Sequence, residues 1–352
     1  MGEPTRLKVI AERLNLSQST VSRALNDYQD ISNRTKKLVR DTAEELGYEP
    51  NPHARRLALG KSYTIGYVMP AQDGQLTETF LGELMAGMAT ALALKGWDLT
   101  VLAPANTEEE MAIFQRIART RHLSGLVISR TYSEDPRFQI LRDLDIPFVS
   151  HGRSNTCGDS AWLDVDNELA FAEMTSHLVS LGHKRIAHIG GSPLYNFARQ
   201  RADGWRRGLR EAGLEIHENF GEATDLSFEG GCAAMERLLR LDEPPTAVCC
   251  VSDVVAIGAM QAIRSSGLQP GREISVIGYD GLELGAWLNP PLTTMRQPLQ
   301  SAGRMLADML IKLVEGERKP TDSQELFRAS FVRRGTANPP VTDWPTSRQE
   351  VR

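Results

Sequence analysis

From residue 64 onward, short apolar or β-branched runs alternate with longer segments of helical periodicity. The runs that predict strands are 64–69, 99–102, 125–128, 147–150, 185–189, 247–251 and 275–278. Segments of helical length lie between them, including 81–95, 169–181 and 254–266. Such alternation predicts an α/β fold of parallel sheets with helices on both faces. Because about 275 residues of this pattern exceed one doubly wound sheet, we expect two lobes.

The residues before this body predict three short helices. Thr5 can cap the first helix and Ser17 the second, and the link from Asn15 to Ser17 requires a tight turn. Asn15 is a residue type that tolerates the left-handed conformation of such a turn. A third helix is expected between Ser32 and Gly47, with Thr35, Leu38, Val39, Thr42 and Leu46 facing inward. This spacing is typical of a helix-turn-helix.

Charge is unevenly distributed between the two regions. Residues 1–62 contain eleven Lys and Arg and eight Asp and Glu, so their formal charge is 11 − 8 = +3. The whole chain carries −5, which leaves −8 for residues 63–352. A basic N-terminal region beside an acidic body indicates that nucleic acid would bind at the N-terminal end.

The second helix presents the polar face that a DNA-reading helix needs. Gln18, Ser19 and Arg23 are expected to contact base edges in the major groove. Polar residues at helix starts and flanks are expected to fix the register on phosphates: Thr20, Ser22, Asn33 and Lys36. Further expected DNA contacts are Thr5, Ser17 and Asn26. The alternative is a small solvated three-helix segment with ordinary surface polarity.

Residues 49–62 begin with two prolines and reach a glycine at position 60, which indicates a linker with a short helix. Its basic side chains could contact phosphates while Leu57 wedges into a minor-groove step and bends the duplex. The DNA contacts expected in this segment are Asn51, His53, Arg55, Leu57 and Ala58. A passive linker is the alternative.

Several motifs of the N-terminal region now point to a known family. They are Ile10-Ala11, Ser17-x-x-Thr20-Val21-Ser22-Arg23-Ala24-Leu25-Asn26, Ile31-Ser32-x-x-Thr35 and Leu46-Gly47-Tyr48-x-Pro50-Asn51-x-x-Ala54-x-x-Leu57. In these motifs the chain closely resembles the LacI/GalR family of bacterial transcriptional regulators. The resemblance implies a homodimer, a pseudo-palindromic double-stranded DNA operator and a hinge helix whose Leu57 enters the minor groove.

The resemblance continues through the acidic body, which looks like the family's periplasmic-binding-protein-like domain. Its motifs are 181–186, Arg199-x-Arg201-x-x-Gly204-Trp205, Ser252-Asp253-x-x-Ala256-x-Gly258-Ala259-Met260, 274–280 and 291–294. The family's two lobes imply three crossovers, expected near 161–164, 288–293 and 319–325. The expected domains are a head (1–49), a hinge (50–62), an effector-binding and dimerisation domain (63–336) and a polar tail (337–352). Within that domain, lobe 1 is expected at 63–162 and 292–320, and lobe 2 at 163–290 and 321–336.

Ligands of open α/β sheets bind at the carboxyl ends of the strands, where this chain has polar loops. By resemblance, Arg201 and Asp280 hold the polar groups of a small-molecule effector. The other expected effector residues are Phe80, Arg130, His151, Arg153, Phe228, Ser252 and Asp253. The alternatives are an interlobe salt bridge for Arg201, a turn cap for Asp280 and a hydrogen-bonded core residue for His151. Because a guanidinium and a carboxylate suit vicinal hydroxyls, a sugar is the expected effector.

The usual signatures of the competing classes are missing from the sequence. No P-loop, nucleophile-elbow, dinucleotide-binding or H-E-x-x-H motif occurs, and the His and Cys residues lack metal-ligand spacing. No signal peptide or membrane span is indicated, so we expect a cytoplasmic protein with reduced thiols. The sequence therefore predicts a repressor of a carbohydrate operon, without cofactor or metal. The alternatives are a purine or other non-sugar corepressor, a cytoplasmic sugar-binding protein, and an enzyme.

Overall fold

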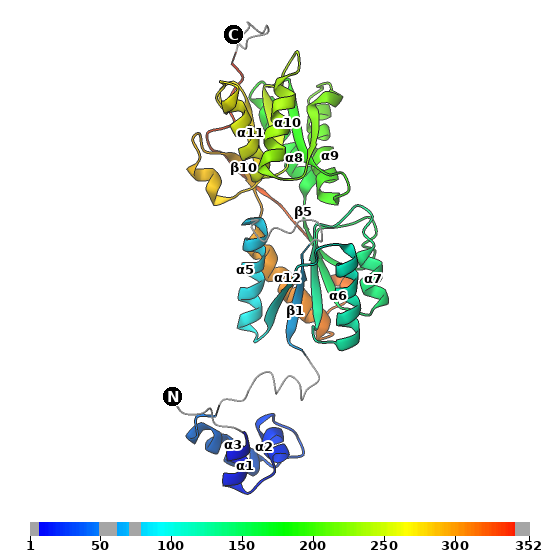
Figure 1. Cartoon of the computed structure of the whole chain (residues 1–352), viewed down its shortest axis with the longest axis vertical. Coiled ribbons are helices and arrows are strands. Elements are labelled where there is room, and N and C mark those ends of the chain that lie inside the picture. The colour runs from blue at the N-terminus through cyan, green and yellow to red at the C-terminus, as the bar shows by residue number, and fades with distance from the viewer. Residues whose placement is uncertain (1–6, 49–61, 70–78, 342–352) are drawn as a thin grey trace. The chain divides into compact units, whose positions relative to one another are not determined.

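The computed structural model describes residues 7–48, 62–69 and 79–341, and the chain divides into two compact units, 1–63 and 64–352 (Figure 1). The first unit contains α1 (Leu7–Leu14), α2 (Gln18–Leu25) and α3 (Asn33–Glu45). Asn15 joins α1 to α2 with a φ of 52°, which confirms the tight left-handed turn. Ser17 and Ser32 cap α2 and α3 as expected.

The core of the first unit forms from the inner faces of all three helices. Ile10, Val21, Ala24 and Val39 are completely buried there. The prediction that Leu38 faces inward is wrong, because 51% of its side chain is exposed. Helix α3 turns Val39, Thr42 and Ala43 toward the core, at the spacing of one helix face, and Leu38 precedes that face.

The second unit contains two six-stranded sheets, each covered by helices on both sides. The strand order of the first sheet is β11-β5-β4-β3-β1-β2, and all of its strand pairs are parallel. These strands are β1 (Thr64–Val68), β2 (Asp98–Leu102), β3 (Gly125–Ser129), β4 (Phe148–His151), β5 (Ala161–Val165) and β11 (Gln324–Phe327). The helices of this lobe are α5 (Thr79–Leu94), α6 (Thr107–Thr120), α7 (Arg137–Asp143) and α12 (Leu299–Val314), with the 3-10 turn η3 (Pro320–Asp322) before β11.

The strand order of the second sheet is β12-β10-β9-β8-β6-β7, and only the β12–β10 pair is antiparallel. Its strands are β6 (Ile186–Gly191), β7 (Gly221–Thr224), β8 (Ala247–Cys250), β9 (Ser275–Asp280), β10 (Thr293–Arg296) and β12 (Ser330–Val332). The helices are α8 (Asn167–Ser180), α9 (Asn196–Glu211), α10 (Phe228–Leu239) and α11 (Asp253–Ser265), with the 3-10 turns η1 (Glu218–Phe220) and η2 (Glu283–Trp287). In Figure 1, α8 and α9 cover one side of this sheet and α10 and α11 the other.

The cores of the two lobes form around short central strands of mostly apolar residues. All five residues of β3 and all four of β8 are buried, so these strands have helices on both faces. Cys249 and Cys250 of β8 are completely buried free thiols packed in the second core, as expected for packing residues. Each of the seven predicted strand runs overlaps an observed strand, which confirms the parallel α/β fold.

The expected lobe boundaries are wrong in detail. The expectation assigned 292–320 to the first lobe, but β10 pairs with β9 of the second sheet. It assigned 321–336 to the second lobe, but β11 pairs with β5 of the first sheet. The chain changes lobe between β5 and α8, between β10 and α12, and between β11 and β12. The crossovers therefore follow complete strands, whereas the positions expected from the family resemblance lay within or before those strands.

The expected tail also begins too early. Ala337 is buried. The carbonyl oxygen of Asn338 accepts a hydrogen bond from Ser275 Oγ (2.9 Å) and lies 2.8 Å from His183 Nε2. Both residues therefore belong to the second lobe. The proposed hinge, with its contacts Asn51, His53, Arg55, Leu57 and Ala58, lies outside the described residues, as do Thr5 and positions 342–352. Within the described ranges, no helix is long and apolar enough to cross a membrane.

Candidate functional site

The first candidate site is the polar face of α2 in the N-terminal unit. Ser17 Oγ accepts a hydrogen bond from the backbone N–H of Thr20 (3.0 Å), which fixes the start of the helix. Gln18 and Ser19 follow on its first turn and are exposed, whereas Val21 and Ala24 bury the opposite face. The expected base-reading side chains therefore lie together on an accessible surface.

Arg23 shares this surface, but its guanidinium has partners within the unit. Its NH2 lies 2.6 Å from the Asp30 carboxylate, and its Cζ lies 5.3 Å from the centre of the Tyr28 ring. Both charged side chains are about half exposed, at 47% and 49%. An exposed ion pair of this kind is weak and exchangeable, so Arg23 remains available to a guanine or a phosphate.

Two of the expected DNA contacts, Lys36 and Asn26, also stabilise the unit. Lys36 Nζ lies 3.1 Å from the Asp27 carboxylate, and this hydrogen-bonded pair holds the pKa of Asp27 below its ordinary value. Asn26 ends α2, and its side-chain amide donates to the carbonyl of Ser22 (2.9 Å). Asn33 is exposed at the start of α3.

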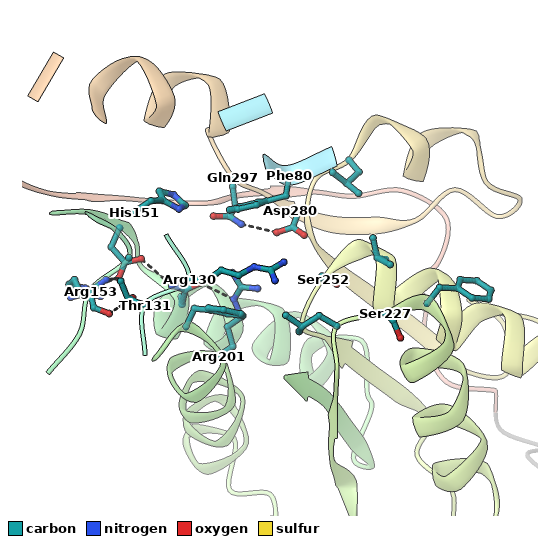
Figure 2. A pocket seen from close by; sticks show the side chains of 18 of the residues that line it. Phe80, Arg130, Thr131, His151, Arg153, Arg201, Ser227, Ser252, Asp280 and Gln297 are labelled. Atoms are coloured by element: carbon teal, nitrogen blue, oxygen red, sulfur yellow. Dashed lines mark hydrogen bonds and ion pairs between the residues drawn. The ribbon is translucent and has the colours of Figure 1, made fainter. Parts of the chain in front are cut away.

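The second candidate site is a cavity of about 340 Å³ between the two lobes of the second unit. Figure 2 shows His151, Thr131 and Arg153 at one end, Ser252 and Ser227 at the other, and Arg130 and Arg201 between them. Eight of the nine expected effector residues line the cavity: Phe80, Arg130, His151, Arg153, Arg201, Phe228, Ser252 and Asp280. Asp253, the ninth, lies below the cavity wall.

Arg201, on α9, is a cation of the cavity wall that is held by several contacts. Its Nε donates to Asn167 Oδ1 (2.8 Å), and its NH1 donates to the carbonyl of Val251 (2.6 Å). Its Cζ also lies 3.9 Å from the centre of the Tyr279 ring. These partners all belong to the second lobe, so Arg201 makes no interlobe ion pair there; its guanidinium is preorganised along the cavity wall.

Asp280 ends β9 and carries a second charge into the cavity. Its Oδ1 accepts a hydrogen bond from Gln297 Nε2 (2.7 Å). Burial raises the pKa of Asp280 to about 6, although Arg201 opposes that shift. The backbone of Asp280 has a φ of 116°, a conformation that L-residues rarely adopt and that is often associated with functional sites.

Asp253 supports Asp280 from below. Its two carboxylate oxygens accept hydrogen bonds from Thr294 Oγ1 (2.6 Å) and from the backbone N–H of Leu282 (2.7 Å). Burial and the neighbouring Asp280 raise the pKa of Asp253 to about 7. The side chain of Asp253, which the sequence analysis expected to contact an effector, is completely buried and does not line the cavity.

In the first lobe, Arg130 follows β3 with a φ of 49°. Burial lowers its pKa. The buried side chain of Arg137 donates to the carbonyls of Ser129 (3.1 Å) and Arg130 (3.2 Å) and is itself paired with Asp135 (2.7 Å). This pair fixes the turn that directs Arg130 into the cavity, and the sequence analysis did not identify it.

His151 ends β4 in the same lobe. Its ring centre lies 5.7 Å from that of Phe80. Its Nε2 is buried and has no hydrogen-bond partner among the residues that the structure describes. Burial lowers the pKa of His151 to about 4, so the imidazole is neutral at pH 7. An unsatisfied polar atom on a cavity wall is suited to a ligand hydroxyl, which favours the effector role over a hydrogen-bonded core residue. Nearby, Arg153 Nε donates to Asp164 Oδ2 (2.8 Å).

The sequence analysis missed other polar residues of the cavity. Asn167 and Gln297 orient Arg201 and Asp280 respectively, and both line the wall. Asn167 follows β5 and Gln297 follows β10, two strands that the sequence pattern did not reveal. The signal that would have found them is a polar residue directly after a strand, but it depends on recognising the strand. Phe197 was also missed, and it adds an aromatic face to the lining.

The residues that line this cavity suit the binding of a small molecule. A buried guanidinium, a fixed carboxylate, a neutral imidazole and aromatic rings supply both the polar and the apolar contacts of a small-molecule site. Among the described residues, no cluster of His, Cys, Asp and Glu has the arrangement that a metal ion would need.

Comparisons with known proteins place both sites in one family. Residues 6–51 match the model of the bacterial regulatory proteins of the lacI family, and residues 175–337 match a periplasmic binding protein-like domain. The HTH-type transcriptional regulator AglR of Rhizobium meliloti (strain 1021) is 39% identical over 342 residues, covering 96% of this chain and 95% of that protein.

Two solved structures are similar to nearly the whole chain. The lac repressor dimer bound to operator and the anti-inducer ONPF has a TM-score of 0.81 at 28% identity, covering 96% of this chain and 100% of that chain. The complex of the transcriptional regulator CelR with cellobiose has a TM-score of 0.74 at 27% identity, covering 95% and 100%. These matches show that the chain belongs to the LacI family of bacterial regulatory proteins and is a DNA-binding transcriptional regulator rather than an enzyme.

Proposed function

We propose that the chain is a cytoplasmic repressor of a carbohydrate operon whose affinity for its operator is controlled by a sugar or glycoside in the interlobe cavity. The observation that carries the proposal is that Arg201 and Asp280 line the same cavity. A planar cation and a fixed carboxylate can bind neighbouring hydroxyls, and Phe197 adds apolar surface to the lining of the same cavity. The cellobiose complex of the similar regulator CelR supports the same ligand class.

The proposed mechanism is a change in the angle between the lobes. Residues of both lobes line the cavity, so an effector that contacts both favours one lobe arrangement over the other. We propose that the hinge at 50–62 transmits this change to the head, where Gln18, Ser19 and Arg23 read bases. The expected coupling of about 1 to 3 kcal/mol corresponds to a change in operator affinity of about 5- to 150-fold.

We further propose that two copies of the chain bind a pseudo-palindromic operator as a homodimer, as two heads match a two-fold symmetric site. The similar lac repressor structure is a dimer on its operator. Two large apolar side chains of η2, Leu284 and Trp287, are 59% and 84% exposed and would be buried by such a contact. Sedimentation at micromolar concentration should give a dimer, and a tetramer would contradict the proposal.

A thermal-shift screen of monosaccharides and disaccharides tests the ligand class. A sugar present at about 100 times its dissociation constant should stabilise the chain by about 2.7 kcal/mol. The same screen should contain purines, the main alternative ligand class. Stabilisation by a purine and by none of the sugars would replace the sugar proposal.

A further inference from the structure

The two lobes meet along one edge of the cavity through a short backbone clasp, which we define as residues 131–133 of the first lobe and 194–196 of the second. Tyr132 and Tyr195 form an antiparallel β-bridge. The N–H of Ser133 donates to the carbonyl of Leu194 (2.9 Å), and the N–H of Asn196 donates to the carbonyl of Thr131 (2.9 Å). These bonds cross the cleft independently of the three covalent crossovers.

Aromatic packing also joins the two sides of this clasp. The rings of Tyr132 and Tyr195 stack with their centres 5.5 Å apart and an interplanar angle of 17°. The loop that carries Tyr132 is held from within its own lobe, because Asp135 Oδ2 accepts from the Tyr132 N–H (3.1 Å). The clasp therefore joins a rigid loop of one lobe to the start of α9 in the other.

One side chain, Asn196, links this clasp to the cavity wall. Its Nδ2 donates to the carbonyl of Arg153 (2.8 Å), which also accepts from Thr131 Oγ1 (2.6 Å). Its Oδ1 accepts from Arg199 NH2 (2.9 Å), so both ends of the amide are used. Asn196 is 3% exposed and does not line the cavity, but Thr131 and Arg153 do.

We propose that Asn196 is a positioning residue for effector binding: it holds the lobes in the closed arrangement in which residues of both face one cavity. It acts through the backbones of Thr131 and Arg153 and does not touch the effector. In the closed arrangement, Arg130 and His151 of the first lobe line the same cavity as Arg201 and Asp280 of the second. The fraction of molecules in this closed arrangement therefore limits the apparent effector affinity. The effector part of this inference rests on the proposed function, whereas the closure itself does not.

Disulfide trapping across the clasp tests the closure directly. The hydrogen bonds lie on either side of the Tyr132–Tyr195 bridge, so these two residues form a non-hydrogen-bonded antiparallel pair. The Cα atoms of such a pair are about 4.5 Å apart, a separation that suits a disulfide. The full chain carrying Tyr132→Cys and Tyr195→Cys would be equilibrated in a glutathione redox buffer without any sugar. Each single-cysteine variant gives the background from the native Cys157 and Cys232.

The comparison is made within this double-cysteine background, so loss of the tyrosine stack is common to all samples. Asn196→Asp places a carboxylate oxygen against the Arg153 carbonyl and should lower the effective concentration of the two thiols by about tenfold or more. Asn338→Asp is the matched control, because Asn338 Nδ2 also donates to carbonyl oxygens, those of Gly271 (2.8 Å) and Gly335 (3.0 Å), but within one lobe. It should leave the trapping unchanged.

Asn196→Ser removes the amide without adding a charge, and it should also lower the effective concentration of the two thiols. This variant keeps the test valid if the Asn196→Asp variant does not fold. Equal trapping with and without the Asn196 amide would overturn the proposal. Absence of trapping in the parent double-cysteine chain would overturn it too, because the bridge would then not form in solution. Since the measurement contains no sugar, its outcome is separate from that of the ligand screen.

Discussion

The residues proposed to read DNA in the head and those proposed to bind an effector in the cavity lie in opposite environments. The expected base-reading residues Gln18, Ser19 and Arg23 are exposed and lie within two turns of α2. Arg201 and Asp280 are at most 9% exposed and are bonded to residues of other elements. Substitutions on the head should therefore change recognition with little effect on folding, whereas substitutions in the cavity should change both.

The largest effect is expected from Arg201→Ala. Removal of two charge-assisted contacts to an effector should weaken effector binding by at least about a hundredfold. It also leaves the Val251 carbonyl without its 2.6 Å donor, so the melting temperature should fall. Arg206→Ala on the same helix is the control, because Arg206 is about half exposed and pairs with Asp203. Calorimetry with a sugar found in the thermal-shift screen measures both variants, and normal affinity in Arg201→Ala would remove Arg201 from the site.

The cavity should also show two opposite responses to pH. In the proposed complex, an ionised Asp280 accepts hydrogen bonds from effector hydroxyls. Because burial raises the pKa of Asp280 to about 6, effector affinity should fall as the pH drops from 7.5 to 5. Folding stability should respond in the other direction. Because the folded pKa is raised, protonation of Asp280 stabilises the fold at low pH, and this contribution is lost as the pH rises through about 6.

Asp280→Asn is the matched variant for this prediction, since it keeps the shape of the side chain and removes the ionisation. Calorimetric titrations at constant ionic strength should show that the variant loses the pH dependence of effector affinity. A wild-type affinity that is the same at pH 5 and pH 7.5 would show that the ionised carboxylate is not the acceptor.

A smaller effect, confined to recognition, is expected from Arg23→Ala. Loss of a base contact should reduce discrimination at one operator position by about 1 to 3 kcal/mol. Stability should change little, because the ion pair with Asp30 is half exposed. Binding-site selection from a random DNA library, run on both proteins, checks this. An unchanged consensus would mean that Arg23 reads no base.

The smallest effect is expected from Ser17→Ala, which removes the cap of α2. The free energy of unfolding of the head should fall by about 1 kcal/mol, because the N–H of Thr20 loses its acceptor. Ser19→Ala, on the exposed face of the same helix, should change it less. Denaturant unfolding followed by circular dichroism measures the difference, and equal losses in the two variants would argue against the cap.

The same contrast explains what the sequence could predict. Local signals sufficed in the head: Ser17, Asn15 and Ser32 mark a cap, a turn and a second cap, and the structure has all three. Leu38 was misplaced because the choice of core face depends on how α3 packs against its neighbours. The cavity depends on pairing between distant strands, which local patterns do not encode.

Two residues of the cavity illustrate this limit. Asn167 and Gln297 follow β5 and β10, near which the family resemblance led us to expect crossovers. Their positions at the carboxyl ends of strands were therefore not recognised. Arg201 and Asp280 were found only through the family resemblance. Nothing in the spacing of residues 201 and 280 indicates that they line one wall, since β9 and α9 come together only in the folded lobe.

Operator affinity measured with and without sugar tests most directly whether the cavity controls the head. The operator would come from the same binding-site selection, and the sugar from the thermal-shift screen. At saturating sugar, the operator dissociation constant should change by about 5- to 150-fold in the wild type, and the operator should change the sugar affinity by the same factor. The Arg201→Ala variant should bind the operator normally and show neither change. An operator dissociation constant that is the same with and without saturating sugar in the wild type would contradict the coupling.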